Sequence, residues 1–151
     1  MTIRPTISAL IAVGCTVLIG CGELENLAGT DISGTVQGQS FSFVSGTAEA
    51  TSQGGYILTL ADDPSYDCAS TPPGMYLTIV ITGVDSTGTI AAPGNVSFNR
   101  IEDGINHTES ATSGSVVIDF LDPDDTRLIE GDVDAASDES SVSGIFSVPI
   151  C

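Results

Sequence analysis

Apolar and polar residues alternate along most of this chain after residue 30. Leu58 and Leu60, for example, flank Thr59, and the same period of two recurs further along. That period is typical of strands that bury one face and expose the other. The pattern occurs in eight segments, namely 32–36, 41–43, 56–60, 77–81, 96–98, 116–120, 129–133 and 142–148.

Twenty apolar side chains occupy the buried phase of these segments, and each contributes roughly 1.5 to 3 kcal/mol when fully buried. They are Ile32, Val36, Phe41, Phe43, Tyr56, Leu58, Leu60, Leu77, Ile79, Ile81, Val96, Phe98, Val116, Ile118, Phe120, Ile129, Val133, Val142, Phe146 and Val148. Glycine and other turn residues separate the segments, and no useful helical stripe lies between them. The pattern therefore predicts one all-β domain over residues 31–151, an antiparallel β-sandwich or barrel of about 8–9 strands.

The first residues follow a different pattern. Residues 7–19 form an apolar or weakly polar run behind Arg4, and the acidic residues Glu23 and Glu25 end it. A membrane-spanning helix needs about 20 apolar residues, so this run is too short for one. Its anatomy is typical of a signal peptide.

The run ends in Leu18-Ile19-Gly20-Cys21, which resembles the lipobox of bacterial lipoprotein precursors. In that family the cysteine sulfur receives diacylglycerol and a peptidase cuts just before it. The resemblance implies a signal peptide over residues 1–20, a lipidated tether over residues 21–30, and Cys21 as the acylated residue. Two alternatives remain: Cys15 as the lipidated residue, or an ordinary signal peptide cut near Gly20 or Gly22.

Several acyl chains would hold the protein durably at a membrane, because each buried methylene adds about 0.8 kcal/mol. In the lipoprotein family, Asp after the lipidated cysteine commonly signals retention in the inner membrane, and this chain has Gly22 there. The resemblance thus implies a lipid-anchored protein of the cell envelope, in the outer membrane of a Gram-negative cell, at its periplasmic face or at the cell surface. A Gram-positive plasma membrane is the alternative.

Charge narrows the range of partners. The chain has a net charge of −17, no Lys, and only Arg100 and Arg127 as basic residues after residue 20. Nucleic-acid binding draws on many basic side chains, so DNA and RNA are excluded as partners. The same charge opposes adsorption to anionic headgroups. We therefore expect membrane association through the lipid alone, and an envelope protein or another cationic molecule as the partner.

Two cysteines remain once Cys21 is lipidated. Cys68 and Cys151 form an even pair in an oxidising compartment, which predicts a disulfide between them. For a loop of about 84 residues, the chain-entropy account gives on the order of 4 to 5 kcal/mol of stabilisation. A reactive thiol at Cys68 is the alternative, although no nearby His, Lys or Arg in the sequence would activate it.

Candidate chemistry is sparse. Asp122, Asp124 and Asp125 predict, at most, an irregular calcium site, because an EF-hand loop counted from Asp122 would need Gly and a carboxylate where Arg127 and Val133 stand. Apart from this ion we expect no cofactor.

No catalytic constellation is evident. His107 is the single histidine, and no G-x-S-x-G motif accompanies it. Glu102 and Glu109 lack the aromatic platform typical of a glycosidase. We therefore expect no catalytic residues and no enzymatic activity.

Residues 34–41 read G-T-V-x-G-x-S-F, and with Cys68 and a final Ser-Gly-x-Phe strand they are similar to small all-β envelope lipoproteins of unknown function. The prediction is a lipid-anchored, non-enzymatic envelope protein with a structural or interaction role. Two alternatives are a lipocalin-like barrel that binds a small ligand and a calcium-dependent binding module.

Overall fold

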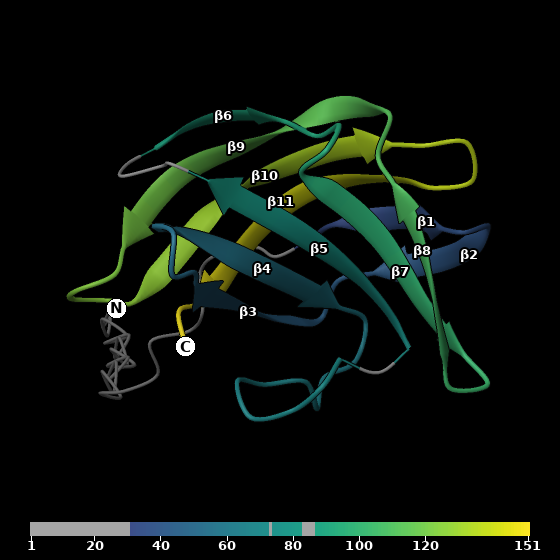
Figure 1. Cartoon of the computed structure of the whole chain (residues 1–151), viewed down its shortest axis with the longest axis horizontal. Helices are drawn as coiled ribbons and strands as arrows, with labels where there is room; N and C mark the ends of the chain where they lie inside the picture. Colours follow the sequence, from purple (N-terminus) through teal and green to yellow (C-terminus); the bar gives the residue numbers. More distant parts are fainter. Residues whose placement is uncertain (1–30, 73, 83–86) are drawn as a thin grey trace, which may run out of the picture.

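The computed structural model describes residues 31–72, 74–82 and 87–151. These residues form eleven strands (Figure 1). The strands are β1 (Ser33–Val36), β2 (Gln39–Ser42), β3 (Ser45–Ala50), β4 (Gly55–Ala61), β5 (Met75–Thr82), β6 (Gly88–Ala91), β7 (Val96–Glu102), β8 (Ile105–Ser110), β9 (Ser113–Asp122), β10 (Leu128–Ala136) and β11 (Ser141–Pro149). Within the described residues, nothing helical is long and apolar enough to span a membrane.

The strands form two antiparallel sheets, which confirms the predicted all-β class. One sheet has six strands in the order β2-β1-β11-β10-β9-β6, and the other has five in the order β3-β4-β5-β7-β8. The chain passes between the sheets four times, at β3, β6, β7 and β9. A single parallel bridge between Ala48 and Ile150 joins β3 to the residue after β11. The architecture is that of a sandwich (Figure 1).

The core lies between the sheets and is apolar. Eighteen of the twenty predicted inward positions are buried, and they form one cluster with residues from both sheets. Tyr56 is half-buried and packs against this cluster. Period-two alternation therefore located most of the core, and Ala48, Ala92, Ala111, Ala135 and Ile150 complete the cluster.

Phe120 is the clear exception, because it is 38% exposed. On β9, Ile118 pairs with Gly131 and Phe120 pairs with Glu130, so Asp119 between them has no partner on β10. This is a β-bulge, and one extra residue reverses the alternation of every side chain beyond it. Phe120 consequently faces outward, while Leu121 packs against the core.

The predicted count of eight or nine strands was too low, because β3, β6 and β8 were missed. Each of them is an edge strand: β3 and β8 form the two edges of the five-stranded sheet, and β6 forms one edge of the six-stranded sheet. Edge strands need less apolar surface than central ones, and β8 has no buried residue at all. Without an apolar face, such strands carry no alternating signal.

Candidate functional site

Cys21, the signal peptide over residues 1–20 and the tether over residues 21–30 lie outside the described residues. Lipidation of Cys21 therefore stays a prediction. The chain enters the described domain at Asp31, whose backbone N–H donates to the carbonyl of Ile145 on β11 at 3.2 Å.

A disulfide joins Cys68 to Cys151, with a Cα–Cα distance of 5.7 Å. Cys68 lies in the loop between β4 and β5, and Cys151 follows β11. The Cys151 N–H donates to the Ala48 carbonyl at 2.8 Å, and Arg127 Nη2 donates to the main-chain oxygen of Cys151 at 2.6 Å. We call Ala48, Cys68, Arg127 and Cys151 the cysteine clasp; it joins β3 and a loop of the five-stranded sheet to the end of β11.

The loop that carries Cys68 is held against its sheet. Tyr66 is buried, and its hydroxyl shares a hydrogen bond of 2.8 Å with Thr47 Oγ1 on β3. Asp63 accepts hydrogen bonds from the Ser65 hydroxyl and N–H, and these bonds lower the pKa of the Asp63 carboxyl. These contacts hold the loop against β3 close to Cys68.

A second set of contacts joins the sheets elsewhere. Ser140, a buried residue in the turn between β10 and β11, donates through Oγ to Glu109 Oε2 on β8 at 2.6 Å. The same Oγ accepts the N–H of Gln37, from the turn between β1 and β2, at 2.9 Å. Gln37 Nε2 in turn donates to the His107 carbonyl on β8 at 2.7 Å. We call Gln37, Glu109 and Ser140 the polar clasp.

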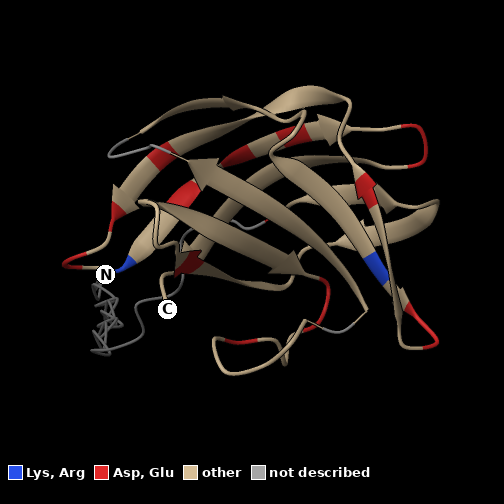
Figure 2. Cartoon of the chain, viewed as in Figure 1, with Lys and Arg blue, Asp and Glu red and all other residues tan. Residues whose placement is uncertain are grey.

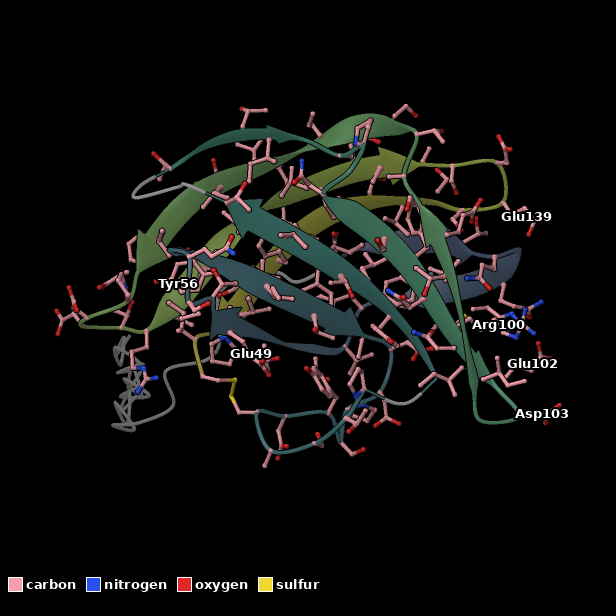
Figure 3. All side chains as sticks on the ribbon, in the orientation of Figure 1. Glu49, Tyr56, Arg100, Glu102, Asp103 and Glu139 are labelled. Atoms are coloured by element: carbon pink, nitrogen blue, oxygen red, sulfur yellow. A yellow bond between two sulfur atoms is a disulfide. The ribbon has the colours of Figure 1, made fainter. Side chains whose placement is uncertain are left out.

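The polar clasp favours a charged Glu109. Burial of its carboxyl opposes ionisation, but hydrogen bonds from Ser140, Ser137 and the backbone of Glu139 and Asp138 outweigh this effect, so the pKa of Glu109 is lowered. Glu109 therefore has a structural role, and it lies far along the β7–β8 hairpin from Glu102. Glu102 pairs with Arg100 at 2.7 Å beside the hairpin turn (Figure 3).

Of the predicted calcium ligands, Asp122 ends β9, whereas Asp124 and Asp125 lie in the turn that follows it. The three carboxylates do not form a ligand cluster. Asp122 Oδ1 accepts the N–H groups of Asp124 and Asp125, and its Oδ2 accepts the N–H and hydroxyl of Thr126, all at 3.0 to 3.2 Å. These hydrogen bonds lower the pKa of Asp122. In residues 31–72, 74–82 and 87–151, no three His, Cys, Asp or Glu side chains are grouped as metal ligands would be.

The outer face of the five-stranded sheet carries polar side chains together with Ile57, which is 38% exposed, and it is almost uncharged. Asn99 is buried there; its amide donates to Thr78 Oγ1 at 3.2 Å and its Oδ1 accepts the Thr108 hydroxyl at 2.8 Å. Asn106 donates to the hydroxyl of Tyr76 at 3.0 Å. Glu49 is the one carboxylate among the outward residues of these five strands (Figure 3).

The outer face of the six-stranded sheet is acidic instead, because carboxylates alternate along β10 (Figure 2). Apolar side chains of β9 and β11 lie beside these carboxylates. Asp132 pairs with Val117 on β9 and with Ile145 on β11, and Glu130 pairs with Phe120. We call this surface the acidic–apolar face; its residues are Val117, Phe120, Glu130, Asp132, Asp134 and Ile145. Sequence reasoning missed it, because it assigned Phe120 to the core.

The surroundings of Asp132 on this face disfavour ionisation of its carboxyl group. Its pKa is raised, first by burial and then by the charge of Asp119 and a hydrogen bond to it. The described arginines lie elsewhere, Arg100 with Glu102 and Arg127 in the cysteine clasp. The carboxylates of the acidic–apolar face therefore have no basic neighbour within the described part of the chain.

The chain matches no protein-family model, no curated protein and no solved structure.

Proposed function

We propose that this protein is a lipid-anchored, non-enzymatic component of the bacterial cell envelope and that its β-sandwich serves as an interaction module. The observation that carries the proposal is the disulfide between Cys68 and Cys151. Such bonds form and persist in extracytoplasmic compartments and are rare in the cytosol. The resemblance of residues 18–21 to a lipobox implies the same compartment, and acylation of Cys21 would provide the anchor.

The packing of the domain supports an interaction role over the binding of a small ligand inside a barrel. A ligand pocket typically occupies about 300 to 1,000 Å³. Here Phe41, Phe98 and Phe146 are buried between the sheets together with aliphatic side chains from both of them. An interior filled in this way leaves the outer faces as the surfaces that recognise a partner.

Metabolic labelling with a fatty acid tests the anchor. We expect label on the wild-type protein, no label on a Cys21→Ser variant, and release of that variant from the membrane fraction. Cys15→Ser is the matched control, because it removes the neighbouring cysteine of the same apolar run, and it should keep the label. Label retained by Cys21→Ser would refute the proposal.

A further inference from the structure

The bulge at Asp119 places an aromatic side chain on the surface. Without the extra residue, Phe120 would share the phase of Ile118 and enter the core; with it, Phe120 is 38% exposed opposite Glu130. Bulges frequently re-aim a side chain where a protein is functional. Ile145, 46% exposed on β11, adds a second apolar side chain to the same face.

The carboxylates beside these side chains are regularly spaced. Glu130, Asp132 and Asp134 occupy every second position of β10 and face the same side. Successive outward residues of a strand lie about 6.6 Å apart. An extended polypeptide laid along β10 presents its own alternate side chains at that spacing, so a basic residue at every second position would meet each carboxylate in turn.

Charge distinguishes between the molecules that could bind the acidic–apolar face. The preceding tether carries Glu23 and Glu25 and, from residue 21 to 30, no basic residue, so it is repelled by this face. A second copy of the chain brings the same acidic surface and a net charge of −17. Anionic headgroups are repelled in the same way. A cationic segment of a different protein remains.

We infer that the acidic–apolar face binds an extended, cationic segment of another envelope protein, in which Lys or Arg occupies every second position. The charged ends of these side chains meet Glu130, Asp132 and Asp134, and their aliphatic stems cover Phe120, Ile145 and Val117. The inference rests on the proposed function, since it names the partner of the interaction module, but the contact itself needs no lipid.

Binding of a labelled peptide to the full chain in detergent tests this inference. The probe alternates Lys with Val, and the comparison peptides are an oligolysine of equal charge and a peptide that alternates Glu with Val. In about 0.15 M salt, where the Debye length is about 8 Å, attraction between charges farther apart than this is largely screened. We expect the Lys–Val peptide to bind, the oligolysine to bind much more weakly, and the Glu–Val peptide not to bind.

Variants locate the site. Phe120→Ser and Ile145→Ser should each weaken binding of the Lys–Val peptide about tenfold, as expected for central apolar contacts. The matched control is Ile105→Ser, which removes an apolar residue that is 61% exposed on β8 of the other sheet, and it should bind as the wild type does. All three positions are exposed, and circular dichroism verifies that each variant is folded.

Three results would overturn the inference: no binding of the Lys–Val peptide, equal binding of oligolysine, or equal losses in all three variants. The Cys21→Ser protein should bind the peptide as the wild type does. Failure of the peptide to bind would therefore contradict only the proposed binding site. Absence of fatty-acid label would contradict only the proposed anchor.

Discussion

The hydroxyl of Ser140, in the β10–β11 turn of the six-stranded sheet, donates a 2.6 Å hydrogen bond to the carboxylate of Glu109 on β8 of the other sheet. The bond to Gln37 makes Ser140 the centre of the polar clasp. The sandwich is thus held by side-chain contacts here and by a covalent bond at the cysteine clasp.

Ser140→Ala should lower the free energy of unfolding by about 1 to 3 kcal/mol, because it leaves the Gln37 N–H and the Glu109 carboxylate without their buried partner. Chemical denaturation measures this change. Ser141→Ala, at the exposed neighbouring position, is the control and should stay within about 0.5 kcal/mol of wild type. If the two substitutions lowered the free energy of unfolding equally, the polar clasp would not stabilise the fold as predicted.

The polar clasp also predicts a dependence of stability on pH. The pKa of Glu109 is lower in the folded protein, so its ionised form stabilises the fold at neutral pH. That contribution is complete above the pKa of the unfolded state and disappears as pH falls through the lowered folded pKa. Unfolding measured against pH should show wild type more stable than Glu109→Gln at neutral pH, with the difference shrinking in acid. A difference that grows in acid would contradict the assigned sign.

Loss of the disulfide should cost about 2 to 5 kcal/mol, the range typical of native bonds in small secreted domains. The Cys68→Ser, Cys151→Ser double variant and the reduced wild-type protein should unfold at the same lower denaturant concentration. The contacts of Tyr66 with Thr47 remain, so the loop should stay folded onto β3 in both. Wild-type stability that does not respond to reductant would show that the bond contributes nothing.

Gly131→Ala should destabilise the protein by about 1 to 3 kcal/mol, the usual range for overpacking. An added Cβ would collide with the Val117 carbonyl on the bulged strand and meet the Phe146 ring at 3.1 Å. Gly88→Ala is the matched control, because its Cβ would meet nothing within 4 Å. Thermal unfolding of the two variants compares them directly, and a larger loss for Gly88→Ala would contradict the close packing at the bulge.

The sequence predicted the central strands because burial on one face imposes a period of two, as at Leu58 and Leu60. It did not predict β8, whose residues have no buried side, or the exposure of Phe120, which depends on a bulge defined by pairing with β10. Only part of the two clasps could be predicted from the sequence. The Cys68–Cys151 pair was predicted because the lipobox assigns Cys21 to the lipid and leaves only these two cysteines in an oxidising compartment. Ser140 and Glu109, in contrast, are 31 residues apart, and nothing in their local pattern marks them as partners.

The pairing of β1 with β11 has a consequence for the order of events in folding. Ser33 pairs with Ser143, so β1 and β2 must wait for nearly all of the intervening chain before they join their sheet. A lone two-stranded hairpin is only marginally stable in water, and folds dominated by such distant pairings form slowly. Until β11 arrives, the free side of β1 is open to strands of other chains, so the risk of aggregation is concentrated in this early interval.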